Sequence, residues 1–112
     1  MMEFKNRTVR HHFFSQPIHR KLLRLLWYVG EVHGCIITSA YRDGDKGVHG
    51  VIPYRGLDIR SWCYIDPQGV VNSINKKWIY DPQRPWLMCA IMHDSGNGEH
   101  IHLQVCERTV KQ

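Results

Sequence analysis

The chain has 112 residues, of which 43% are hydrophobic and 22% are charged. This composition is typical of one globular domain, and it excludes a disordered tail, a coiled coil and a collagen-like chain. No apolar run approaches the ~18 residues that span a bilayer, and the first residues lack the apolar core of a signal peptide. We therefore expect no membrane insertion, and synthesis in the cytoplasm without a signal peptide.

The charge balance is mildly basic. Lys and Arg number 15 against 10 Asp and Glu, a formal net charge of +5. A basic surface attracts polyanions such as nucleic acid or an anionic cell-wall polymer. However, no run of Lys and Arg exceeds two residues, and the sequence contains no zinc-finger pattern or helix-turn-helix. A nucleic-acid partner is therefore not expected.

The first third of the chain predicts an arm followed by one helix and one strand. Residues 1–14 are polar and irregular, so we expect a loosely ordered arm. Ser15 and Pro17 are typical of a helix start. Apolar residues at helical spacing then predict a helix over 16–29, closing near Gly30 or Gly34, with Trp27 packed near its end. The β-branched residues at 35–39 predict a buried strand.

The remainder predicts three more strands and a second helix. Residues 42–56 are rich in Gly, Asp and Arg, and a loop of this length is often functional. Strands are expected over 57–62, 86–92 and 100–105, with a turn over 94–98 and a helix from Asp66 to Trp78. The fold class is therefore α+β, a small antiparallel sheet with flanking helices in a single domain over 1–112.

The four cysteines are Cys35, Cys63, Cys89 and Cys106. Their wide spacing contains no C-x-x-C pair, which argues against a zinc ribbon. Each lies within or beside an apolar, strand-like stretch, so we expect buried free thiols in a reducing compartment.

Eight histidines make a metal or acid–base site worth seeking. Three polar elements fall where expected strands meet loops, namely His49, Asp58 and the segment 99–102. A catalytic zinc takes three ligands from His, Asp, Glu or Cys and keeps one position open for water. A nearby carboxylate outside the ligand set can then act as a general base, and Glu99 is such a candidate.

These residues carry a family resemblance over roughly 35–105. The stretch 37–42 (Ile-Thr-Ser-Ala-Tyr-Arg), then His49, then 56–59 (Gly-Leu-Asp-Ile), then Glu99-x-x-His102 resembles the M15-type zinc peptidases. This group comprises D-Ala-D-Ala carboxypeptidases and L-alanyl-D-glutamate endopeptidases, which share a fold with the hedgehog signalling domain. Two departures are that His49 and Asp58 lie farther apart than is usual, and that Gly47 stands where the family often has serine.

The resemblance implies a role for each matched residue. His49, Asp58 and His102 would bind Zn²⁺, and Glu99 would take a proton from the nucleophilic water. Arg42 would hold the substrate or the developing oxyanion. Ser39 and His100 would contact substrate, and His100 stays open as the ligand in place of His102.

The resemblance also implies an activity. It predicts a zinc metallopeptidase that hydrolyses peptidoglycan stem peptides, an endolysin-like enzyme of a bacteriophage or prophage that acts at the cell wall or periplasm after release. Carboxypeptidase and endopeptidase action both remain open. The alternative is a non-catalytic zinc-binding module on the same fold, such as a virion or wall-binding component, since fold does not decide activity.

Overall fold

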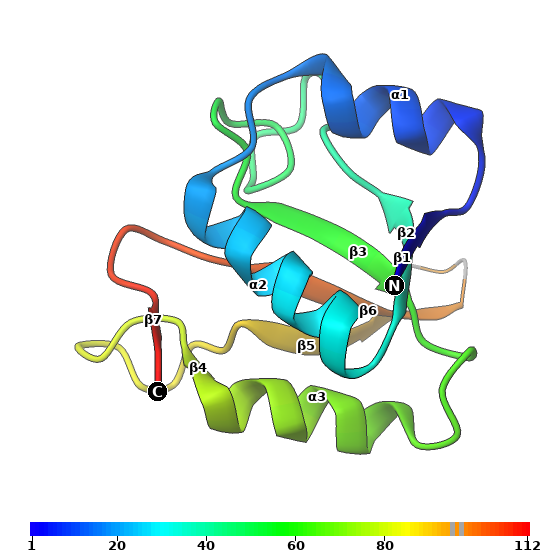
Figure 1. Cartoon of the computed structure of the whole chain (residues 1–112). Helices are drawn as coiled ribbons and strands as arrows, with labels where there is room; N and C mark the ends of the chain where they lie inside the picture. Colours follow the sequence, from blue (N-terminus) through cyan, green and yellow to red (C-terminus); the bar gives the residue numbers. More distant parts are fainter. Residues whose placement is uncertain (95, 97) are drawn as a thin grey trace.

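The structure is a computed structural model that describes residues 1–94, 96 and 98–112 (Figure 1). Its elements, in chain order, are β1 (Met2–Phe4), α1 (Arg7–Ser15), α2 (Arg20–Val32), β2 (Cys35–Ser39), β3 (Gly56–Arg60), α3 (Pro67–Lys77), β4 (Trp78–Ile79), β5 (Ala90–Asp94), β6 (Glu99–Gln104) and β7 (Val110–Lys111).

The main sheet has five strands in the order β1-β2-β3-β6-β5, and β4 pairs with β7 in a small second sheet. The α+β class is confirmed. The sheet is mixed, however, because β1 runs parallel to β2 while the other pairs in this sheet are antiparallel. The expected all-antiparallel sheet is wrong in this respect: α1 and α2 together form the crossover that a parallel neighbour requires.

Residues 1–14 are ordered, which corrects the expected loose arm. Met2 lies opposite Cys35 in the ladder between β1 and β2. Asn6 caps α1 by accepting a hydrogen bond from the Val9 amide at 2.9 Å. Val9 and Phe13, four residues apart, are both buried, so this short helix packs one stripe against the core.

Helix α2 begins later than the sequence indicates. Ser15 is the last residue of α1, and the side chain of His19 caps α2 instead. Gly34 then adopts a φ of 70°, which suits glycine just after a helix end. Four side chains of α2 are fully buried, namely Leu22, Leu25, Leu26 and Val29. Trp27, expected to be packed, is 60% exposed.

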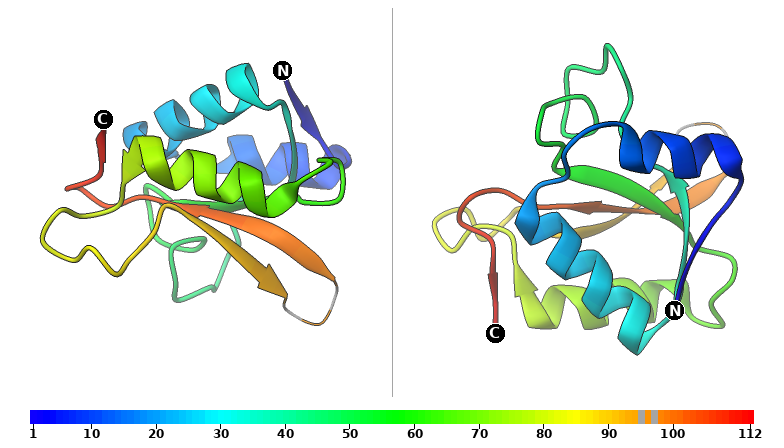
Figure 2. Two further views of the ribbon diagram at one scale, coloured as in Figure 1. Left: turned by 90° about the horizontal axis from the view of Figure 1, so that it is seen from below. Right: turned by 45° about the horizontal axis from the view of Figure 1, so that its top comes forward.

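Helices α2 and α3 lie on one side of the main sheet, and the 40–55 segment lies on the other side (Figure 2). Alternation along a strand sends successive side chains to opposite faces. Leu57, Ile59, Ile101 and Leu103 are fully buried, whereas Asp58, His100 and His102 occupy the alternate positions of the same strands. The helix-free face therefore carries the polar residues.

The remaining elements agree with the sequence in part. The expected helix from Asp66 is confirmed, with Asp66 as its cap. Strand β5 starts at Ala90 rather than at residue 86, because Leu87 is held in a turn by a bond from its amide to the Arg84 carbonyl at 3.0 Å. The side-chain amide of Asn75, from α3, makes two hydrogen bonds of 2.9 Å with the backbone of Ala90. The turn expected over 94–98 includes Ser95 and Asn97, which lie outside the described residues.

All four cysteines are free thiols, and three of them are buried. Cys63 is exposed, which corrects the expectation for that residue, because it follows the end of β3 rather than lying within it. None of the helices in the described part of the chain is long and apolar enough to cross a membrane.

Candidate metal centre

The candidate site lies on the helix-free face, where β3, β6 and β5 adjoin. Asp58 of β3 lies directly opposite His102 of β6, and His102 lies opposite Ile91 of β5. His49 reaches the same place from the 40–55 segment. Together with Arg42, His93 and His100, these residues line a pocket of about 250 Å³.

Backbone contacts hold His49 at this position. The Arg42 amide donates to the His49 carbonyl at 2.9 Å, and the Arg55 amide donates to the Val48 carbonyl at 2.8 Å. Gly56 permits the close approach, because a Cβ there would lie 2.3 Å from a Val48 methyl and 3.1 Å from the His102 ring. Any larger residue at 56 would push Val48, the neighbour of His49, away from the His102 ring.

The hydrogen bonds of His102 define its tautomer. The Gln104 amide donates through Nε2 to the Met88 carbonyl at 3.0 Å, so its Oε1 is the atom that faces His102. His102 Nε2 lies 3.1 Å from that Oε1 and must carry the hydrogen. The neutral ring then has a lone pair on Nδ1, which lies 3.0 Å from Asp58 Oδ1.

His49 follows the same logic. Its Nδ1 lies 3.0 Å from the Ala40 carbonyl, which can only accept, so Nδ1 carries the hydrogen. Nε2 therefore presents its lone pair to Asp58 Oδ1, at 3.5 Å. In metal sites, the second nitrogen of a ligating histidine is commonly held by an acceptor in this way.

Two imidazole lone pairs and a carboxylate oxygen thus converge with no hydrogen between them. Without a cation, each ring would need a second proton to bond with Asp58, whereas one divalent ion satisfies all three groups. One ligand atom from each of these residues lies within 4.8 Å of the others. Tetrahedral zinc with bonds of ~2.0–2.2 Å places neighbouring ligand atoms about 3.4 Å apart, close to the observed contacts. His49, Asp58 and His102 can therefore hold a metal ion.

Asp58 is the electrostatic centre of the site. It is 3% exposed, and its Oδ2 accepts from Arg42 Nη2 at 2.8 Å and lies 3.5 Å from His100 Nε2. Burial alone would raise the pKa of Asp58, but without a cation hydrogen bonds from His102 and His49, which each ring can make only with its second proton, and the charges of His49 and His100 hold that pKa well below the usual range. The carboxylate is thus ionised and fit to bind a cation.

The structure brings most of the expected site residues together. Arg42 also donates through Nε to Ser39 Oγ at 2.9 Å and pairs with Asp45 at 3.5 Å, so Ser39, Arg42 and Asp58 form one chain of contacts. His100 lines the pocket beside Asp58. Of the two candidate histidines on β6, His102 belongs to the three-residue cluster that could hold a metal ion, and His100 does not.

Glu99 is placed differently. It precedes His100 on β6, so its side chain leaves the strand on the opposite face from those of His100 and His102. It does not line the pocket of the His–Asp–His cluster. Instead it borders a neighbouring groove of about 250 Å³, which also contains Arg60 and Trp62.

Sequence reasoning missed two residues of the site. His93 packs edge-on against His100, with ring centroids 5.1 Å apart, and Gln104 holds His102. His93 lies opposite His100 in the β5–β6 ladder, and Gln104 lies two residues after His102 on β6. The alternation from His100 through His102 to Gln104 is visible in the sequence and could have identified Gln104.

Comparison of the chain with protein-family models, with curated proteins and with solved structures finds no match.

Proposed function

We propose that this protein is a metal-dependent hydrolase that cleaves peptide bonds in cell-wall peptidoglycan. The observation that carries the proposal is the convergence of two imidazole lone pairs and an ionised carboxylate, each ligand histidine being fixed by an acceptor behind it. Two histidines and one aspartate leave a coordination position open, which is the pattern of a catalytic rather than a structural zinc site. The motif resemblance to M15-type zinc peptidases supports the reaction class.

A bound Zn²⁺ would supply Lewis-acid chemistry, polarising a peptide carbonyl and lowering the pKa of water towards ~7. The side chains around it divide the remaining work. Arg42 lies at the pocket with its side chain 45% exposed, so its guanidinium can bind a substrate carboxylate or a developing oxyanion. Ser39 and Asp45 orient that guanidinium from either side.

Proton transfer falls to His100 in this arrangement. It lines the metal pocket, whereas Glu99 lies outside it. Its Nε2 is within 3.5 Å of Asp58 Oδ2, and the His93 ring supports it from β5. A histidine there can take a proton from water and deliver it to the leaving amine. Glu99 remains the proton acceptor that the resemblance implies. Substituting each residue in turn shows whether His100 or Glu99 is the base.

The shape of the site supports an extended substrate. The metal pocket and the neighbouring groove share Arg42, Asp58 and His100 as lining residues, so the two adjoin each other. The groove is also lined by Lys5 and Arg60. A peptide bearing carboxylates, as stem peptides do, would match those charges.

A second candidate function is a non-catalytic metal-binding module. The observation that favours it is the position of Glu99, since the expected general base does not reach the cluster. In this reading the same three ligands hold a structural ion, and the groove binds the wall without cutting it.

The experiment begins with protein purified without an affinity tag. Bound metal is measured by elemental mass spectrometry for the natural chain, for Asp58→Ala and for Asp43→Ala, which alters an exposed aspartate of the same segment. We expect near one metal ion per chain in the natural protein and in Asp43→Ala, and none in Asp58→Ala. Absence of metal after incubation with zinc would overturn the proposal.

Activity is then followed as release of new amino groups from purified peptidoglycan, with mass spectrometry of the fragments. Hydrolysis that disappears in Asp58→Ala and with a chelator supports the enzyme. A full complement of metal with no hydrolysis assigns the protein to the non-catalytic module instead.

A further inference from the structure

A second large groove in the described part of the protein lies away from the metal centre. It has a volume of about 690 Å³ and runs between the outer side of α2 and strand β7. Helix α2 covers the opposite face of the sheet from the 40–55 segment that carries His49 (Figure 2). A ligand in this groove would therefore leave the metal pocket free.

The groove exposes aromatic surface. Trp27 lines it and is 60% exposed, although the buried stripe of its helix is only one residue away. Tyr28 and Trp78 extend the surface inward, their ring centroids 6.1 Å apart in an edge-to-face arrangement. An exposed indole beside two further rings is a ready platform for a flat apolar ligand face.

The groove also holds a hydrogen-bond donor without an acceptor. Trp78 is 6% exposed, and its Nε1–H has no hydrogen-bond partner within the described residues. Buried polar groups are nearly always bonded, so such a donor calls for an explanation. Lys111, the cross-strand neighbour of Trp78, holds its ammonium over the Tyr28 ring at 5.1 Å. This nitrogen is buried, so a ligand in the groove reaches it only when a neighbouring side chain moves aside.

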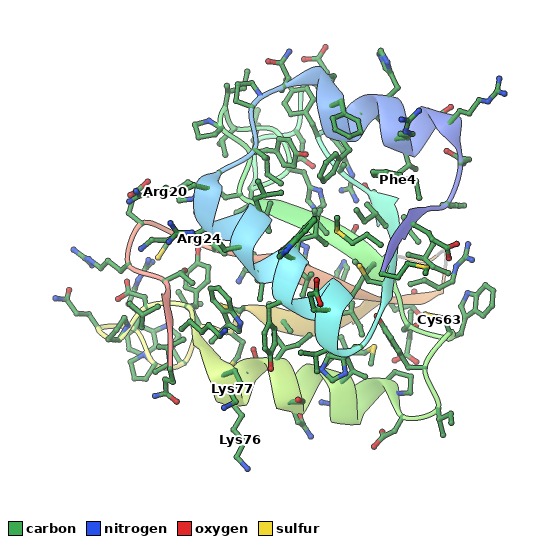
Figure 3. The ribbon with its side chains drawn as sticks, in the orientation of Figure 1. Phe4, Arg20, Arg24, Cys63, Lys76 and Lys77 are labelled. Carbon is green, nitrogen blue, oxygen red and sulfur yellow. The ribbon has the colours of Figure 1, made fainter. Side chains whose placement is uncertain are left out.

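The charges in the groove are mixed. Lys21, Arg24 and Lys111 line it together with one acid, Glu31. Figure 3 shows Arg20 and Arg24 projecting from α2 towards the side where β7 lies, and Lys76 and Lys77 projecting from the end of α3. Neither Arg24 nor Lys111 has an ion-pair partner among the described residues. The surroundings therefore favour an anionic ligand.

Glu31 narrows the ligand class. Its carboxylate repels any anionic group beside it and accepts hydrogen bonds from hydroxyl groups, so the ligand must place hydroxyls next to Glu31 and its acid groups next to Lys21, Arg24 and Lys111. An acidic sugar supplies all the groups that this lining can bind. Its acid groups suit the cations, its hydroxyls suit Glu31, another oxygen suits Trp78 Nε1, and its apolar ring face suits Trp27. We propose that the groove between α2 and β7 is a binding site for an acidic saccharide. The proposal does not depend on the metal centre.

The first test is a glycan array that carries acidic and neutral saccharides, probed with the full chain. We expect binding to acidic saccharides and none to their neutral counterparts. The best acidic ligand is then titrated by tryptophan fluorescence, with the oligonucleotide dT8 as a second probe. Tighter binding of dT8 through the same residues would overturn the assignment and point to single-stranded nucleic acid.

Three variants locate the site. Trp27→Ala and Arg24→Ala should each weaken saccharide binding at least fivefold. Trp78→Phe keeps an aromatic ring but removes the N–H, and should weaken it severalfold. The matched control is Trp86→Ala, which removes another exposed tryptophan that lies outside the groove and should leave the affinity within twofold.

Circular dichroism checks that each variant is folded. Asp58→Ala should bind the saccharide as the natural chain does, which separates this site from the proposed hydrolase. No acidic glycan bound on the array, or equal binding by the natural chain and Trp27→Ala, would overturn the proposal.

Discussion

Replacement of Gln104 by leucine is the sharpest test of the metal centre. Gln104 is not a ligand, but its Oε1 holds the hydrogen of His102 on Nε2 and leaves the Nδ1 lone pair facing Asp58. Without that acceptor, His102 is free to place its hydrogen on Nδ1. It would then donate to Asp58 Oδ1 at 3.0 Å, a contact that the metal must break.

The expected size follows from these contacts. Loss of one hydrogen bond to a half-buried group costs about 1 kcal/mol, and competition from the new bond to Asp58 adds a similar amount. A total of about 2 kcal/mol corresponds to roughly thirtyfold weaker zinc binding. This lies within the ~10–100-fold range seen when such supporting residues are removed.

The assay is competition for zinc against a chromogenic chelator at neutral pH. Gln104→Glu retains an acceptor and should bind zinc within a few-fold of the natural chain. Gln68→Leu, on the exposed side of α3, is the control and should change nothing. If Gln104→Leu is folded and binds zinc as tightly as the natural protein, our assignment of the His102 tautomer is incorrect.

Three further predictions concern catalysis, pH and stability. His100→Gln should lower peptidoglycan hydrolysis by ~100-fold or more while retaining metal, whereas Glu99→Gln should change the rate only a few-fold; the opposite order would restore Glu99 as the base. The pKa of Asp81 is lowered by its hydrogen bond from Arg84 at 2.7 Å, despite burial. Because this pKa is lower in the folded than in the unfolded chain, Asp81 stabilises the fold at pH values above the ordinary aspartate range, and this stabilisation is lost on acidification. The urea midpoint of Asp81→Asn should therefore fall less between neutral and acid pH than that of the natural chain. Leu26 is fully buried, so Leu26→Ala should lower the free energy of unfolding by about 3 kcal/mol. Leu23 is 40% exposed, so Leu23→Ala should lower it by well under 1 kcal/mol. Equal losses in chemical denaturation would contradict the packing described for α2.

Elements with strong local signals were predictable from the sequence. Strand β2 has its expected bounds, because a run of β-branched residues directly after Gly34 favours a strand over a helix. Helix α3 begins after Asp66, whose side chain caps it as the Asp-Pro pair indicates. Both elements are determined by interactions among a few residues that are neighbours in the sequence.

Other features depend on distant contacts. The arm at 1–14 lacks a strong pattern, and its order arises because β1 pairs with β2 and Phe13 packs against Phe4, with ring centroids 5.3 Å apart. The Asn6 cap and the four-residue spacing of Val9 and Phe13 were the local signs of α1. Ser15 and Pro17 indicated the start of a single helix, and this prediction is wrong because the end of α1 and the start of α2 lie close together.

The candidate site divides in the same way. The cluster of His49, Asp58 and His102 was expected from motif order, and the structure brings these three residues together. The position of Glu99 followed from the strand itself: residues three apart on a strand face opposite sides. His93 could not be found, because its place beside His100 depends on the register between β5 and β6.

Asn75 has a consequence for the protein in crowded solution. Strand β5 ends the main sheet, and an unpaired strand edge is a template on which a second chain can add. By bonding both the amide and the carbonyl of Ala90, the Asn75 side chain occupies the place that a neighbouring strand would take. The backbone groups of Ala90 are therefore already bonded within the chain and are not available to a second strand at this end of β5.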